Sequence, residues 1–507
     1  MAAADARDEA GVVFPPTQDG HRSTLETGRA VIADALRPAS ATAATAAEQE
    51  RDWRRRYIVH ARRLTEAAFR SAADANDTAA AGLESMRRRM RFARGDAEIQ
   101  IEDAMATPRR AYATRRVAGT RRDGPAPLAI PLQGRMLDGD DLRRVLDRWQ
   151  SEGYFEPSFL EAIERVRAHP EWLDLSDQSF ALLGAQAEMS PLPWLLNWRA
   201  TVYAIDLPRP AIWQSLQKAA VEGNGNLLAP FDPADAAAVA GADLIADAPE
   251  IASWLATAPA PLTVGAYAYL DSAQHVRVSV AMDAIQAHLA ARRRDVTLAM
   301  LATPTDACAV PAGALRMAHE RYAHRGVATR LMGAASLGRA FARNGEWLAA
   351  EPASDAAPGG IVDALVVQQG PNYLLAKRLQ LWRALVARAT GTRVSFRIAP
   401  PAMTYSVTKN RLLAAVYGSA HRFGAMAFEP ATAAALMAVL LVHDLRHPAA
   451  IGNPGIALDH PLQLVTDAAF HGGLWRMPFA PRSALPAAAL IGMLGRPAPA
   501  RARDAHP

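Results

Sequence analysis

The chain has a single cysteine among its 507 residues, and this scarcity excludes several kinds of site. Cys308 has no second thiol within the chain, so no internal disulfide can form, and zinc sites built from paired cysteines are excluded. Such a composition suits a reducing compartment, and we predict a cytoplasmic protein. His443 and His447 stand four residues apart without a third ligand, so we predict no metal site.

Long apolar runs are also missing. The most apolar stretch, Ala433 to Val442, is about half of the roughly 20 residues that cross a bilayer, and it predicts a buried helix. The opening residues, MAAADARDEAG, include acidic side chains and no apolar segment of signal-peptide length. We therefore expect neither secretion nor a membrane partner.

Neither sign of charge is in large excess, because the net charge is +5. Arginines are concentrated near the start, at Arg54 to Arg56, Arg87 to Arg89 and Arg121 to Arg122. No interleaved aromatic residues and no nucleic-acid-binding motif accompany them. We interpret these arginines as solvated helix faces and do not expect a nucleic-acid partner.

What the chain has in quantity is hydrophobic residues, at 50% of the total, enough for a large core. We predict a disordered tail over residues 1–50, an Arg- and Ala-rich helical region over 51–125, and a helical cap over 126–178. An α/β domain is predicted over 179–310 and 361–485, interrupted by an insertion over 311–360. A C-terminal tail is predicted over 486–507.

From residue 179 onward, short apolar runs alternate with helical stretches. This pattern is typical of a parallel sheet with helices on both faces. It predicts strands over 179–183, 200–205, 261–266 and 296–302, and a long helix over 276–289. The predicted fold class is therefore α/β, with a doubly wound parallel sheet that follows an N-terminal helical region.

The first two strands and the turn between them have the spacing of a nucleotide-binding unit. Gly184 ends the first strand, and Asp206 ends the second, 22 positions later, where a carboxylate can accept the ribose hydroxyls of an adenosine. Gly184 permits a tight turn, and Ser190 can cap the next helix and donate to a phosphate. Glu188 and Ser190 replace glycines of the usual fingerprint. Asp206 favours NAD, whereas Arg209 leaves NADP possible.

The most specific motif is GPNYLLAK at residues 370–377, followed by GTRVSFRIAP at 391–400. It resembles the catalytic helix and the next strand of the short-chain dehydrogenase/reductases, a Rossmann-type family. The resemblance implies that Tyr373 is the proton donor and that Lys377 binds the nicotinamide ribose. Because residues four apart share a helix face, we expect Lys377 to lower the pKa of the Tyr373 phenol from its usual value of about 10.

The same resemblance assigns further residues. Residues 242–247 resemble the third strand, with Asp243 on the adenine side of the cofactor. The family's catalytic serine follows the fifth strand, where Thr303 and Thr305 are the nearest hydroxyls in this chain. A second copy of the Tyr-x-x-x-Lys pattern, Tyr405 with Lys409, begins in the family's substrate loop, so we prefer the first copy.

These observations predict an NAD(P)-dependent oxidoreductase that transfers hydride to or from a small carbonyl or alcohol substrate. The implied cofactor is NAD, with NADP possible, and family analogy implies a homo-oligomer that associates through the Tyr373 helix. Glu188 and the missing serine leave a second hypothesis open, a non-catalytic Rossmann-like protein for nucleotide binding or assembly, without a catalytic cofactor. A methyltransferase, which rests on Gly184 and Asp206 alone, is a third.

Overall fold

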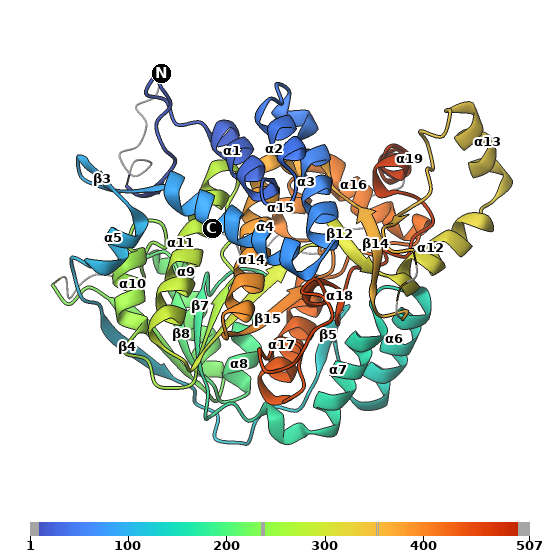
Figure 1. Ribbon diagram of the computed structural model, residues 1–507. Helices are drawn as coiled ribbons and strands as arrows, with labels where there is room; N and C mark the ends of the chain where they lie inside the picture. The colour runs from blue at the N-terminus through green and yellow to red at the C-terminus, as the bar shows by residue number, and fades with distance from the viewer. Residues whose placement is uncertain (1–9, 235–238, 351, 353, 495–507) are drawn as a thin grey trace.

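The centre of the protein is a seven-stranded sheet in the order β15-β11-β10-β7-β8-β9-β4 (Figure 1). The computed structural model describes residues 10–234, 239–350, 352 and 354–494. Six strands are parallel, and β4 pairs antiparallel with β9 at one edge. The strands are β4 (Ala113–Ala118), β7 (Ser179–Leu183), β8 (Thr201–Ile205), β9 (Asn226–Phe231), β10 (Leu262–Ala266), β11 (Val296–Ala302) and β15 (Arg393–Ile398). The predicted α/β class is confirmed.

The third parallel strand is not where the sequence pattern predicted it. Residues 242–247 form turns, in which Asp243 Oδ1 accepts a hydrogen bond of 2.8 Å from the Ile245 amide. The strand that takes this place is β9, which contains Pro230. A proline argues against a central strand, but here its neighbour is the short edge strand β4, which tolerates it.

The strands bury both of their faces. In β7, Phe180 and Leu182 belong to one apolar core, and Ala181 and Leu183 belong to the other. Against the Ala181 face pack α10 (Ala248–Leu255), α11 (Ser272–Arg292) and α14 (Gly370–Ala389), and against the Phe180 face pack α8 (Leu192–Asn197), α9 (Pro210–Glu222) and α17 (Pro430–Arg446). The predicted buried helix over 433–442 lies within α17 and is confirmed.

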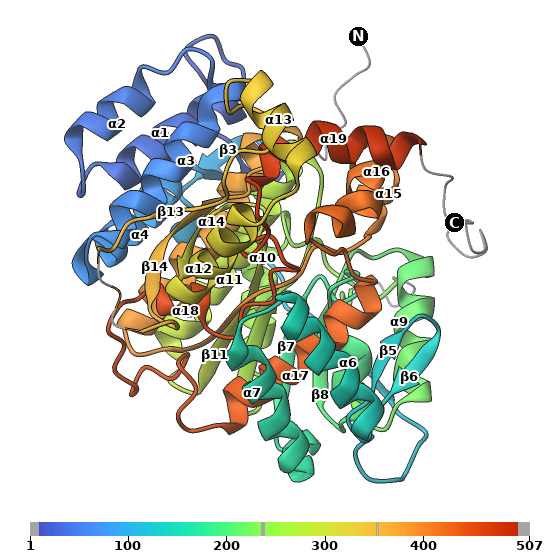
Figure 2. The same cartoon turned by 90° about the vertical axis from the view of Figure 1, so that its right-hand side faces the viewer.

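The N-terminal region is a second layer of helices over α14 (Figures 1 and 2). It comprises β1 (Gly11–Val13), α1 (Thr24–Leu36), α2 (Ala41–Glu48), α3 (Trp53–Phe69), α4 (Ala72–Arg89), β2 (Arg91–Arg94), β3 (Ala97–Ile99) and α5 (Ile101–Ala106). The expected disordered tail over 1–50 is therefore wrong for residues 10–50, and residues 1–9 lie outside the described part. Small side chains let these helices approach closely, since a Cβ at Gly82 would stand 2.6 Å from the Trp382 ring.

The other segments cover the opposite face and one end of the sheet. The predicted cap contains β5 (Ile130–Leu132), β6 (Arg135–Leu137), α6 (Gly139–Glu152) and α7 (Pro157–Ala168), of which α7 packs on α17. The insertion and its flanks contain β12 (Ala307–Pro311), α12 (Ala312–Ala323), α13 (Val327–Ala335), β13 (Glu346–Trp347) and β14 (Pro358–Asp363). The remaining helices are α15 (Tyr405–Thr408), α16 (Arg411–Ser419), α18 (Gln463–Thr466) and α19 (Pro481–Leu494).

Two predictions concern the end of the chain and the membrane. The tail expected from residue 486 is helical in α19 as far as Leu494, and residues 495–507 lie outside the described part. Within the described residues, no helix combines the length and the apolar character that a bilayer span requires.

Candidate functional site

A cleft of about 680 Å³ opens where β10, β11 and β15 end. Its floor is made by residues that directly follow these strands, among them Tyr267, Thr303 and Pro400. Its walls come from the starts of α1, α3, α11 and α14 and from the α15–α16 segment. Ligands of open α/β sheets bind at the carboxyl ends of the strands, and pockets of this volume hold small molecules.

The cleft brings together three of the predicted catalytic residues. Tyr373 lies in the first turn of α14, Lys377 one turn later, and Thr303 just after β11. The Tyr373 phenol hydrogen-bonds with Thr303, whose Oγ1 lies 2.8 Å from Oγ1 of Thr305. Thr305 is buried and does not line the cleft, so Thr303 is the hydroxyl that adjoins both the phenol and the open space.

The expected effect of Lys377 on Tyr373 is wrong. Burial raises the pKa of the Tyr373 phenol above its usual value, and the hydrogen bond with Thr303 opposes this shift only partly. Lys377 Nζ instead donates to the Leu301 carbonyl oxygen at 3.0 Å and to Gln380 Oε1 at 3.2 Å. Burial lowers the pKa of Lys377 to about 8. Tyr373 therefore keeps its proton at neutral pH, as a proton donor must.

His275, in the first turn of α11, is a cleft residue that the sequence did not indicate. Its ring stacks on Tyr373, with 5.7 Å between ring centroids, and only 2% of its surface is exposed. Burial, with a smaller contribution from Lys377, lowers its pKa to about 3, so the ring is neutral. Nδ1 accepts from the Leu270 amide at 3.5 Å, and Nε2 has no partner in the described part of the chain. A lone histidine at a helix start gives no motif that could have been found.

The predicted cofactor-binding residues on the adenosine side do not line this cleft. Gly184 has φ +91°, and a Cβ there would lie 2.5 Å from the Ala268 amide nitrogen, so the turn after β7 requires glycine. Asp206 accepts hydrogen bonds from the backbone amides of Gln186 and Leu207, both at 2.9 Å. Burial raises the pKa of the Asp206 carboxyl. Both of its oxygens thus already have partners within the turn.

The other two predicted cofactor-binding residues, Ser190 and Asp243, also form hydrogen bonds within the protein. Ser190 is buried, and its Oγ accepts from the Leu192 amide at 3.4 Å. Asp243 holds a turn whose Ile245 carbonyl accepts a 3.0 Å hydrogen bond from Val12 of β1. Both residues stabilise loops around the sheet.

Glu188, the residue that departs from the glycine pattern, connects two parts of the cleft. Its carboxylate accepts from the Tyr405 backbone amide at 3.0 Å, at the beginning of α15. The turn after β7 is thereby tied to the segment after β15.

The second Tyr-x-x-x-Lys copy has a different environment from the first. Tyr405 is 69% exposed and does not line the cleft. Lys409 forms an ion pair of 2.5 Å with Asp271 at the rim. Of the two copies, only Tyr373 with Lys377 places its phenol at the ends of the parallel strands.

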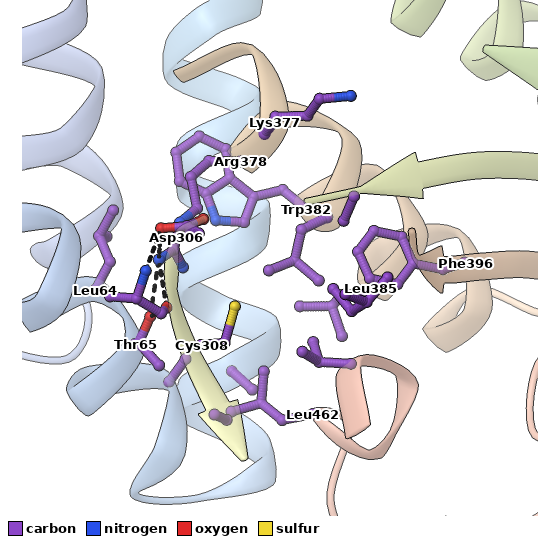
Figure 3. A pocket seen from close by; sticks show the side chains of 18 of the residues that line it. Leu64, Thr65, Asp306, Cys308, Lys377, Arg378, Trp382, Leu385, Phe396 and Leu462 are labelled. Atoms are coloured by element: carbon purple, nitrogen blue, oxygen red, sulfur yellow. Dashed lines mark hydrogen bonds and ion pairs between the residues drawn. The ribbon is translucent and has the colours of Figure 1, made fainter. Parts of the chain in front are cut away.

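A second, much smaller cavity of about 30 Å³ lies behind Lys377, between α3, α14 and β12 (Figure 3). It has room for about one water molecule. Arg378 donates to Asp306 and Thr65 at its edge, at 2.8 and 2.9 Å, and the Lys377 amino group extends away from this ion pair (Figure 3). At about 30 Å³ the cavity is too small for a substrate.

His443 and His447 lie at the end of α17, where His443 contacts Asp444. Within the described ranges, no group of three or more His, Cys, Asp or Glu side chains is placed to hold a metal ion. Comparison with protein-family models, curated proteins and solved structures gave no match.

Proposed function

We propose that the protein is an NAD(P)-dependent oxidoreductase of short-chain dehydrogenase/reductase type, which interconverts a carbonyl compound and its alcohol. The observation that carries the proposal is the meeting of Thr303, Tyr373 and Lys377 in one cleft, although about 70 residues separate Thr303 from Tyr373 in the sequence. Such a set of a hydroxyl, a phenol and an amine suits proton transfer to a carbonyl oxygen.

The order of the strands supports a Rossmann-like sheet. Numbered along the chain, the six parallel strands lie in the order 3-2-1-4-5-6, from β9 through β7 and β10 to β15. This is the order of dinucleotide-binding sheets, in which the ligand lies where the order reverses, beside strands 1 and 4. The cleft is lined at that place by residues 187–189 after β7 and by Ala266 and Tyr267 at the end of β10.

In this proposal the residues have separate roles. Bound NAD(P)H would supply the hydride to the carbonyl carbon. Tyr373 donates its proton to the carbonyl oxygen as negative charge develops there, and Thr303 hydrogen-bonds to the same oxygen and orients it. In the oxidation direction, Tyr373 takes the alcohol proton back. Lys377 lies one helical turn from Tyr373 and can hold the ribose hydroxyls next to the nicotinamide.

The residues present fit the two halves of a dinucleotide unequally. The cleft and the Tyr373–Lys377 pair fit the nicotinamide half. At the adenosine half, Asp206 favours NAD over NADP, but its carboxylate must share its lone pairs with the Gln186 and Leu207 amides. This internal pairing favours the second candidate, a non-catalytic Rossmann-like protein that binds a nucleotide or assembles with a partner.

Titration with NADH and NADPH, followed by energy transfer from tryptophan to the nicotinamide, distinguishes the two candidates. We expect saturable binding, with Kd raised at least about tenfold in Asp206→Ala and in Lys377→Ala, equivalent to about 1.4 kcal/mol each. Lys218→Ala is the matched control, because Lys218 lies on α9 and its side chain is 76% exposed. If neither nucleotide binds, the non-catalytic candidate replaces the oxidoreductase.

A further inference from the structure

Three helices, α1, α3 and α14, begin at the cleft. The three pack against one another, as the ribbon shows (Figures 1 and 2). The first residues of α1, Thr24 and Leu25, line it, as does Arg54 at the second position of α3 and the first turn of α14 from Gly370. The first amides of a helix have no partner within the helix and carry partial positive charge, which favours anions.

The positive end of α14 has no acidic residue at or next to it in its own sequence, whereas α3 has the acidic Asp52 as its N-cap residue. Neither helix has an acidic residue in its first turn. Among the described residues, the N-cap residues Asp52 and Gln369 make no side-chain hydrogen bond to the first amides. Both helices have more than 15 residues, so the partial charge at each end is fully developed.

Arg54 adds a full charge to the same wall of the cleft. Its neighbours are occupied, since Arg56 pairs with Glu50 at 2.8 Å and Arg55 lies 3.9 Å from Asp52. Arg54 is exposed and has no ion pair with any residue in the described ranges. The acidic residues that line the cleft are committed elsewhere, because Glu188 accepts from the Tyr405 amide and Asp271 pairs with Lys409. Among the described residues, neither of these carboxylates forms an ion pair with Arg54.

His275 is an independent sign that the cleft holds a ligand with oxygen acceptors. Because Nδ1 accepts from the Leu270 amide, the proton of the neutral ring lies on Nε2, which is a donor. This donor is buried and unpartnered within the described part of the chain, and its residue lines the cleft next to Tyr373 of the α14 first turn. Buried donors are almost always paired, so a ligand oxygen is the expected partner.

We propose that the cleft binds the anionic group of an organic acid substrate, a carboxylate or a phosphate, between Arg54 and the first turns of α3 and α14. His275 Nε2–H donates to another oxygen of the same molecule near Tyr373. The reaction itself rests on the proposed oxidoreductase function. The anion site adds the substrate class, which is carbonyl or alcohol compounds that carry a negative charge.

Calorimetric titration of the full chain with succinate and, separately, with inorganic phosphate tests this site without catalysis. We expect binding of at least one anion in the millimolar range, weakened about tenfold or more in Arg54→Gln. Arg55→Gln is the matched control, because Arg55 follows in the chain, is exposed and does not line the cleft. Stronger binding of succinate assigns the site to a carboxylate, and stronger binding of phosphate assigns it to a phosphate.

Equal affinities in the two arginine variants, or no binding of either anion by the wild-type protein, would overturn the inference. In a second measurement, His275→Phe removes the donor and keeps an aromatic ring beside Tyr373, and we expect weaker binding of succinate than in His275→Gln, which keeps an N–H. Parallel NADH titrations separate the two proposals. If NADH binds but anion binding does not depend on Arg54, only the anion site is rejected. If anions bind in an Arg54-dependent way but NADH does not bind, only the oxidoreductase proposal is rejected.

Discussion

Replacing Tyr373 with phenylalanine is expected to lower kcat by about 10² to 10⁴-fold, the usual contribution of a general acid. The change removes only the hydroxyl that hydrogen-bonds with Thr303 and keeps the ring that stacks on His275. Because binding contacts are kept, the Kd for NADH should change by less than about twofold. Steady-state kinetics with a charged carbonyl substrate and a parallel NADH titration measure the two effects.

The second Tyr-x-x-x-Lys copy provides the control for this experiment. Tyr405→Phe alters the same residue type in the same motif, but Tyr405 is exposed and lies outside the cleft lining. We expect kcat to be unchanged in this variant. If Tyr373→Phe turned over at the wild-type rate, Tyr373 would not be the proton donor, and a selective loss in Tyr405→Phe would move the assignment to the second copy.

Replacing Asp444 with asparagine is expected to lower the free energy of unfolding at pH 7 by about 3 to 5 kcal/mol. Asp444 is 1% exposed and accepts hydrogen bonds from Arg397 Nε at 2.9 Å and from Ser395 Oγ at 2.6 Å. The variant leaves the buried guanidinium of Arg397 with only the carboxylate of Asp467, 2.9 Å away. These contacts fasten β15 to α17, and β15 leads directly into Ala399 and Pro400 of the cleft.

Urea denaturation measures this change, and Asp177→Asn is its control. Asp177 forms a 2.6 Å pair with Arg446, but its side chain is 57% exposed, so we expect a loss of at most about 1 kcal/mol. If both variants lost the same free energy of unfolding, the buried contacts of Asp444 would stabilise the protein no more than the exposed ion pair of Asp177.

The contribution of Asp444 to the free energy of unfolding should also depend on pH. Despite the opposing effect of burial, Arg397 and His443 hold the pKa of Asp444 at about 2, below the usual 3.8. A carboxyl with a depressed pKa stabilises the folded state above the unfolded pKa and loses that contribution as the pH falls through the folded value. The difference between wild type and Asp444→Asn should therefore narrow between about pH 4 and pH 2.

Strands and the main site helix could be predicted because their signals are local. Buried parallel strands are continuous apolar runs, as in 179–183 and 296–302, and both were placed correctly. The spacing of Tyr373 and Lys377 fixes their shared helix face, and the carboxyl end of β11 brings Thr303 to them.

The features that could not be predicted depend on contacts between distant segments. Residues 10–50 contain few large apolar side chains, yet Val31, Ile32 and Leu36 are fully buried because α14 and α4 supply the missing surface. The pKa of Tyr373 is raised because the phenol is buried and because Lys377 donates to the Leu301 carbonyl oxygen. The four-residue spacing of Tyr373 and Lys377 in the sequence indicates neither of these contacts.

Family analogy implies that copies of the chain associate through the Tyr373 helix, α14. In the structure, one face of α14 is covered by the N-terminal helices. α4 packs along α14, so closely that a Cβ at Gly82 would stand 2.6 Å from the Trp382 ring. A homo-oligomer that used this face of α14 would first have to displace the N-terminal helices. If the protein self-associates, we therefore expect a different surface to carry the contact.

The walls of the cleft are drawn from nearly the whole chain, from Thr24 to Tyr417. A ribosome adds about 5 to 20 residues per second, so roughly 20 to 80 s pass between the appearance of the first wall residue and the last. During that time the apolar sides of α1, α3 and α4 that pack on α14 in the folded protein remain uncovered, because α14 is synthesised much later. We therefore expect the nascent chain to need chaperones that cover these apolar sides until α14 has been synthesised.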